Sequence, residues 1–337
     1  EYLAHLDELP LGPNMACLLG HSGLRAHVMG LGDALSKKQK PTKEELAKMD
    51  ALLEEALDAG YLGLSISTLP WDKMDGEIFR SRPMPSVFAR WSEYRHLAKQ
   101  LRERGKVLQA VPNISTKINV PLLFAMSAGL LRKGLKTTII SMMDIKADRF
   151  AFRIAGALAR VVNRFLGGDL RMQALPNVFD LWADGIDLVV FEELEAGTAA
   201  LHLKGADREQ LLRDPAYRKR FKKQWKNKLL PRAFHRNLAD TEILDCPGDP
   251  TLVGLSFQDV AESRGQDIVD CFLDLVLEHG DDLRWYTVMG NDRPEWLKWI
   301  VNHPDILIGF SDAGAHLRNM AHYNFPLRLL KMVRDAE

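Results

Sequence analysis

Short apolar runs that alternate with amphipathic stretches constrain the fold of this chain more than any other feature. Most of these runs are apolar throughout, as expected for parallel strands that are buried on both faces and covered by helices. The sequence therefore predicts an α/β fold built from repeated strand and helix units. The runs are residues 15–21 (MACLLGH), 62–67 (LGLSIS), 107–113 (VLQAVPN), 137–143 (TTIISMM), 170–176 (LRMQALP), 286–291 (YTVMGN) and 306–312 (ILIGFSD).

Helices are predicted between these strands. The clearest one opens with the capping-box pattern Thr42-Lys43-Glu44-Glu45 and closes at Gly60. Apolar spacing predicts further helices over residues 93–104, 121–133, 150–166 and 267–279. So many repeats of strand and helix favour a (β/α)8 TIM-like barrel over a doubly wound sheet.

Two stretches interrupt this rhythm. Residues 70–85 are rich in turn formers and charges, which predicts a long loop or lid. Residues 206–249 predict a helical insertion that contains the basic run 218–228 (RKRFKKQWKNK). Basic side chains beside Phe221 and Trp225 could bind nucleic acid, but we favour a surface helix anchored by the two aromatic residues.

The charge and the cysteine content of the sequence limit the kinds of binding partner and the compartment that we expect. The 337 residues carry 45 basic and 45 acidic side chains, so the formal net charge is zero. Long-range attraction to nucleic acid or to an anionic membrane is therefore not expected, and a small-molecule substrate is. Three cysteines without metal-binding spacing, and the lack of a long apolar run or signal-peptide pattern, predict a cytoplasmic protein. A homo-oligomer is left open.

Asp312 is the strongest candidate for a catalytic residue. It follows the buried run 306–310 and precedes a loop of small residues, Ala313-Gly314-Ala315. Catalytic side chains of barrels project from the carboxyl ends of strands, where a carboxylate can move a proton during hydrolysis. The alternative is an aspartate that caps the next turn, and the spacing alone does not separate the two.

Other polar residues at strand ends complete the predicted site. His21 ends the first run beside small residues, and His316 follows Asp312 in the last loop. We predict His21, His316 and Asp312 as metal ligands, and Arg318, His322 and Ser311 as substrate-binding residues. Each has an ordinary structural alternative, such as a histidine bonded to a carbonyl or an arginine in a surface ion pair. Nucleotide-binding, serine-hydrolase and HExxH motifs are absent from the sequence.

Three blocks of the sequence resemble the N-acyl-D-amino-acid deacylase (D-aminoacylase) branch of the amidohydrolase superfamily. The first contains Asn14-Met15-Ala16-Cys17-Leu18-Leu19-Gly20-His21 and continues through Leu24-Arg25 to Val28-Met29-Gly30. The second is Ala56-Leu57-Asp58-Ala59-Gly60 with Leu62-Gly63-Leu64-Ser65. The third runs from His303-Pro304 through Ser311-Asp312-Ala313-Gly314-Ala315-His316 to Phe325-Pro326-Leu327-Arg328-Leu329-Leu330.

This resemblance implies a metal-dependent hydrolase that uses zinc or another divalent metal to cleave the amide of an N-acyl amino acid, with the N-acyl-D-amino acids as the expected substrates. Asp312 matches the catalytic aspartate of the family. Residues 1–337 would form the central and C-terminal part of one barrel, a fragment without the family's N-terminal metal motif and C-terminal β domain.

One departure from the family supports an alternative function. The sequence has no histidine between His96 and His202, where the family places metal ligands on the middle strands. The amides of Gln109 and Asn113 and the carboxylate of Asp144 could line a pocket there, but none of them replaces an imidazole for zinc. Three possibilities follow: an unusual metal site that uses ligands upstream of this sequence, a divergent branch with other chemistry, or a catalytically silent barrel that binds a ligand or a partner.

Overall fold

We describe the protein from a computed structural model, which places residues 2–12, 14–74, 76–130, 132–230, 232–309, 311 and 318–335. The chain divides into two compact units. The first comprises Glu1–Met142, Arg153–Ala174 and His303–Leu307, and the second comprises Met143–Phe152, Leu175–Asn302 and Ile308–Glu337. Each unit is described by itself.

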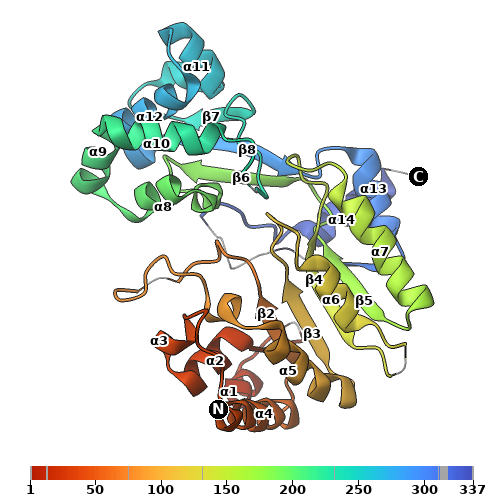
Figure 1. Cartoon of the computed structure of the whole chain (residues 1–337). Coiled ribbons are helices and arrows are strands. Elements are labelled where there is room, and N and C mark those ends of the chain that lie inside the picture. The colour runs from red at the N-terminus through yellow and green to blue at the C-terminus, as the bar shows by residue number, and fades with distance from the viewer. Residues whose placement is uncertain are drawn as a thin grey trace. The chain divides into compact units, whose positions relative to one another are not determined.

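A six-stranded sheet with the order β1-β2-β3-β4-β5-β9 organises the first unit (Figure 1). Strands β1 to β5 pair successively in parallel, as the apolar runs predicted. The described residues thus confirm an α/β fold with a parallel sheet, and a closed eight-stranded barrel stays a prediction. The strands are β1 (Leu18–Gly20), β2 (Gly63–Ser67), β3 (Val107–Val111), β4 (Lys136–Met142), β5 (Asp169–Ala174) and β9 (Ile306–Ile308).

Close approach between two strands explains a glycine at the start of β2. Gly63 is paired with Val107 of β3. A Cβ atom on Gly63 would lie 1.8 Å from the carbonyl oxygen of Val107. Only glycine fits there without moving the backbone of β3.

Helices cover this sheet and seal its core. The predicted capping box is confirmed, because the Thr42 hydroxyl accepts from the Glu45 amide at 3.1 Å and the Thr42 amide donates to the Glu45 carboxylate at 2.7 Å. Helix α5 buries Tyr94, Leu97 and Leu101 along one face. The helices are α1 (Tyr2–Glu8), α2 (His21–Met29), α3 (Leu31–Ala34), α4 (Lys43–Asp58), α5 (Trp91–Glu103), α6 (Val120–Ser127) and α7 (Ala151–Phe165), with the 3-10 helix η1 (Pro85–Phe88).

A three-stranded antiparallel sheet with the order β6-β8-β7 lies in the second unit. The run 286–291 does form a strand, β8 (Arg284–Gly290), but the prediction that it is parallel was wrong. Its neighbours β6 (Phe179–Asp184) and β7 (Thr241–Asp245) were not predicted as strands. Both contain acidic residues and lack a continuous apolar run. Because β6 and β7 could not be recognised as strands, the sequence contains no indication of an antiparallel partner for β8.

Helices and a packed aromatic core complete the second unit. The remaining elements are η2 (Val189–Glu193), α8 (Glu195–His202), α9 (Gly205–Arg213), α10 (Pro215–Lys226), η3 (Pro250–Leu252), α11 (Phe257–Arg264), α12 (Ile268–His279), η4 (Gly280–Asp282), α13 (Pro294–Asn302) and α14 (Phe325–Arg334). In the predicted insertion, α10 buries Phe221 and Trp225 against Phe191, so the two aromatic residues anchor the helix as predicted.

Ion pairs account for the basic face of α10. Arg218 pairs with Asp274, Lys222 with Asp270, and Lys226 with Asp267, all on α12 or at its N-cap.

The predicted loop 70–85 carries a single antiparallel bridge between Lys73 and Pro83 in its described part. In the described part of the chain, no helix has the length and apolar character needed to cross a membrane.

Candidate functional site

His21 lies in the first unit, where it begins α2 directly after β1. The side chain is fully buried, and both ring nitrogens lie within hydrogen-bond distance of protein groups. Nδ1 is 3.0 Å from the Ser86 hydroxyl and Nε2 is 3.1 Å from a carboxylate oxygen of Glu93. A metal could bind His21 only if one of these contacts were given up, so its role as a ligand stays a prediction.

Glu93 joins His21 to Arg25, the other buried charge of this cluster. The Arg25 guanidinium donates to Glu93 and also to the carbonyl oxygen of Ala34, at 3.2 Å. Burial acts to raise the pKa of Glu93, but the hydrogen bonds and positive charges of His21 and Arg25 outweigh it and hold the pKa below its usual value. Glu93 is therefore a carboxylate fixed in its ionised form between two buried partners.

Ser86, His21 and Glu93 have the order of a nucleophile, a base and an orienting acid. Ser86 has no exposed surface, however, and its hydroxyl also accepts from the Ser67 amide. A nucleophile must reach its substrate, so this arrangement is structural: it fastens η1 and α5 to the end of β1.

A cavity of about 440 Å³ opens beside this cluster, at the carboxyl ends of β2 and β3. Thr68 and Asn113, which follow these strands, line it with Asn119, Lys37 and Trp91. Asn119 donates to the Thr68 hydroxyl at 2.5 Å and accepts from the Asn113 amide at 3.1 Å. The prediction that Asn113 lines a pocket is thus confirmed.

Asp144, the other carboxylate expected to line a pocket, lies in the second unit and is fully buried. Arg293 binds it with two contacts of 2.7 Å, and Arg149 approaches to 3.3 Å. Asn291, in the left-handed region at φ 56°, accepts from the Asp144 amide at 2.9 Å. Asp144 therefore holds Arg149 and Arg293, two residues of its own unit, through salt bridges, and it has no exposed surface that could face a ligand.

His322 is the second buried histidine, and it lies in the second unit beside Asp180 of β6. Its Nδ1 is 3.8 Å from a carboxylate oxygen of Asp180 and 3.3 Å from the amide nitrogen of Asn177. Burial raises the pKa of Asp180 despite the positive charges of His322 and Arg328 nearby. Burial likewise raises the pKa of Tyr286, whose hydroxyl is 3.5 Å from Asp180.

The other predicted residues fall in the same stretch of sequence as His322. Arg318 is half exposed and pairs with Asp187 and, at 3.6 Å, with Asp184. Ser311 is partly buried. Asp312 and His316 lie outside the described residues. The structure thus places His21 in one unit and Arg318, His322 and Ser311 in the other.

Within the described residues, no three histidine, cysteine or acidic side chains come together in a way that could hold a metal ion. The described part of the chain therefore does not fit a metal centre by itself. His21 and His322 each contact one carboxylate, and such pairs lack the third ligand that zinc requires.

Sequence reasoning missed Asp180, Glu93 and Ser86. Asp180 could have been found by alternation, since residues 179–184 (FDLWAD) place polar side chains between apolar ones. Glu93 and Ser86 carry no local signal, because the partner they share, His21, lies 72 and 65 residues away in the sequence.

The chain is similar in sequence to several known proteins. No protein-family model matches it. It is 46% identical over 342 residues to uncharacterized proteins of Mycobacterium bovis and Mycobacterium tuberculosis, a match that covers 100% of this chain and 56% of each relative. The chain therefore spans about half the length of the curated relatives it matches.

A D-aminoacylase of Alcaligenes xylosoxydans xylosoxydans is 42% identical over 65 residues, which are 19% of this chain and 12% of that protein. This likeness confirms the resemblance seen in the sequence. Among solved structures, N-acyl-D-glutamate deacylase from Bordetella bronchiseptica, complexed with zinc and a phosphonate inhibitor, has a TM-score of 0.48 at 19% identity. A D-aminoacylase has a TM-score of 0.44 at 19% identity, and each match covers 91% of this chain and 50% of the other.

Proposed function

We propose that the protein is an amidohydrolase that cleaves the amide bond of an N-acyl amino acid, with the N-acyl-D-amino acids as its substrate class. The observation that supports this most is the 42% identity to D-aminoacylase over 65 residues. The block from Ser311 to His316, a few residues after β9 in the sequence, adds a carboxylate and an imidazole of the kind that hydrolysis requires.

Asp312 takes the central role in this proposal. It accepts a proton as water is activated and returns it to the nitrogen of the leaving amine as the C–N bond breaks. Arg318 and Ser311 would hold the substrate carboxylate. His322, the third residue proposed to bind the substrate, is buried against Asp180 and would have to become accessible to do so.

The proposed cofactor is zinc or another divalent metal, which when bound lowers the pKa of its water ligand. Because the described residues do not assemble a metal site, the proposal assigns the ligands to Asp312, His316 and further residues outside the described part, with His21 the one described candidate.

The test uses the full-length protein and two variants. Metal content is measured by elemental analysis, and amine release is followed for a panel of N-acetyl-D- and N-acetyl-L-amino acids. Asp312→Asn should lower kcat at least about a hundredfold, the usual contribution of a general acid or base, without changing the urea midpoint. Asp335→Asn, an exposed carboxylate paired with its neighbour Arg334, is the matched control. Full activity without the Asp312 carboxylate would contradict the proposal.

The silent barrel is the second candidate, favoured by the lack of histidine between positions 96 and 202. In that case the protein would purify without stoichiometric metal and would release no amine from any substrate of the panel. It would still bind N-acyl amino acids in calorimetry, which separates it from an inactive preparation of an enzyme.

A further inference from the structure

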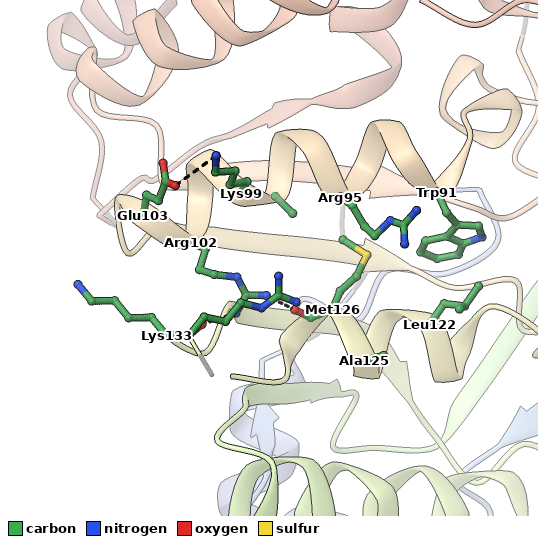
Figure 2. A pocket seen from close by; sticks show the side chains of 11 residues that line it. Trp91, Arg95, Lys99, Arg102, Glu103, Leu122, Ala125, Met126 and Lys133 are labelled. Atoms are coloured by element: carbon green, nitrogen blue, oxygen red, sulfur yellow. Dashed lines mark hydrogen bonds and ion pairs between the residues drawn. The ribbon is translucent and has the colours of Figure 1, made fainter. Parts of the chain in front are cut away.

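A second cavity, of about 550 Å³, lies in the first unit between α5 and α6 (Figure 2). None of the residues proposed for catalysis, metal binding or substrate binding lines it, although Trp91 also lines the cavity beside β2 and β3. Its apolar surface comes from Ala98 of α5 and from Leu122, Ala125 and Met126 of α6. Trp91 closes one end beside Leu122, whereas Arg102 and Lys133 lie toward the other end.

Positive charge gathers at the end of the cavity away from Trp91. Arg102 is almost fully buried and donates to the carbonyl oxygens of Met126, Ala128 and Lys133. These acceptors fix the guanidinium in place but carry no countercharge. Burial lowers the pKa of Arg102, and repulsion from Arg132 lowers it further. Two like charges thus lie near each other at this end, and among the described residues no acidic side chain forms an ion pair with either of them.

The other charged residues that line the cavity do not neutralise the positive charge of Arg102 and Arg132. Glu103 is the one acidic residue among the lining side chains, and it pairs with Lys99 at 3.9 Å. Within the described ranges, neither Arg95 nor Arg132 makes an ion pair with an acidic side chain. Guanidinium groups bind carboxylate and phosphate oxygens through two parallel hydrogen bonds, and burial strengthens such contacts.

We propose that this cavity binds an amphipathic organic anion, whose carboxylate or phosphate head contacts Arg102, Arg132 and Lys133 and whose apolar body lies along Met126, Ala125 and Leu122 toward Trp91. An anion relieves the repulsion between Arg102 and Arg132, which an uncharged ligand cannot do. The apolar surface between the charged end and Trp91 excludes a small inorganic ion as the best occupant, because burying that surface favours a ligand with a hydrocarbon or flat body.

The test titrates the full-length protein with octyl phosphate and with octanoate, each below its critical micelle concentration. Calorimetry measures the affinity and the stoichiometry of each anion. We expect one molecule of at least one of these anions to bind. Inorganic phosphate, which has the head alone, and 1-octanol, which has the body alone, should each bind at least about tenfold more weakly.

Two variants separate the head from the body. Arg132→Gln should weaken binding about tenfold or more, the value of one charge-assisted hydrogen bond. Ala125→Trp fills the cavity and should weaken the octyl compounds while leaving the charged end intact. Lys136→Gln, an exposed cation outside the lining, is the control and should bind as the parent does. All are compared by urea denaturation, so that a loss of binding is not a loss of folding.

Three outcomes would overturn the proposal. The first is that neither anion binds the parent protein. The second is that 1-octanol or inorganic phosphate binds as tightly as octyl phosphate. The third is that Arg132→Gln and Ala125→Trp both bind the octyl anions with unchanged affinity. None of these outcomes depends on hydrolysis, so a protein that fails as an amidohydrolase can still confirm the anion site, and the reverse also holds.

Discussion

Each unit of the protein buries one histidine beside one carboxylate, but the two pairs have opposite electrostatic settings. In the first unit, His21 and Arg25 both contact Glu93 and keep its pKa below the usual value. In the second unit, no guanidinium contacts Asp180 within salt-bridge distance among the described residues, and burial raises its pKa. The first pair is a closed structural clamp, whereas burial makes the carboxyl of the second pair harder to ionise.

The difference between the two pairs lies in the cationic partners of the buried carboxylate. A buried carboxylate with two cationic partners gains stability from its charge, and losing one partner leaves an uncompensated ion. A buried carboxylate without such partners is held at a cost, and the folded protein binds its proton more tightly. Equivalent substitutions in the two pairs should therefore have opposite effects on the free energy of unfolding.

The largest effect should follow Glu93→Gln. This change leaves the fully buried Arg25 without a countercharge, so we expect the free energy of unfolding to fall by about 3–5 kcal/mol in urea denaturation at pH 7. Glu103→Gln, an exposed change on the same helix, is the control and should cost less than about 0.5 kcal/mol. A small loss in Glu93→Gln would show that the clamp does not stabilise the unit.

The free energy of unfolding should depend on pH in the direction set by the lowered pKa of Glu93. Because the pKa of Glu93 is lowered in the folded state, its contribution to stability is complete above the pKa of an unfolded glutamate and is lost as the pH falls through the folded pKa. The difference between the parent and Glu93→Gln should therefore shrink as the pH is lowered from 5. A constant difference would contradict an ionised Glu93.

His21→Phe should have the next largest effect. The variant keeps an aromatic ring but removes both nitrogen contacts, so Ser86 and Glu93 each lose a buried partner. We expect the free energy of unfolding to fall by about 1–3 kcal/mol. His27→Phe, at an exposed position of the same helix, is the control. Elemental analysis of the full-length variant also tests the predicted ligand role, because a fall in metal content would support it and unchanged metal would assign His21 to the clamp alone.

Asp180→Asn should change stability in the opposite direction. The raised pKa means that the ionised carboxylate costs free energy in the folded state at neutral pH; this cost shrinks as the pH falls through the folded pKa and is gone below the pKa of the unfolded chain. We expect the variant to match the parent or to exceed it by up to about 1 kcal/mol at pH 7. Asp184→Asn on the same strand breaks an ion pair with Arg284 and should be slightly destabilising. A clear loss of stability in Asp180→Asn would remove the contrast between the two pairs.

The sequence predicted the parts of the fold that local patterns control. Apolar runs located the strands of the parallel sheet, and Thr42 and Glu45 located the start of α4. The antiparallel sheet was missed because Asp180 and Asp184 interrupt the apolar pattern of β6. The His21 clamp was missed for another reason: Ser86 and Glu93 reach it only through tertiary packing. The roles predicted for Asp312 and His316 stay predictions, since both lie outside the described residues.

Arg318→Gln should have the smallest effect on stability and a separate effect on the substrate. The side chain is half exposed, and its partners Asp187 and Asp184 are accessible to water, so the free energy of unfolding should fall by about 0.5 kcal/mol or less. If Arg318 holds the substrate carboxylate as proposed, KM for an N-acyl amino acid rises while kcat is nearly unchanged, because the lost contact is the same in the ground state and in the transition state. Arg284→Gln removes the other cation that pairs with Asp184 and is the matched control. An equal rise of KM in both variants would assign the effect to the charge of this surface and not to Arg318.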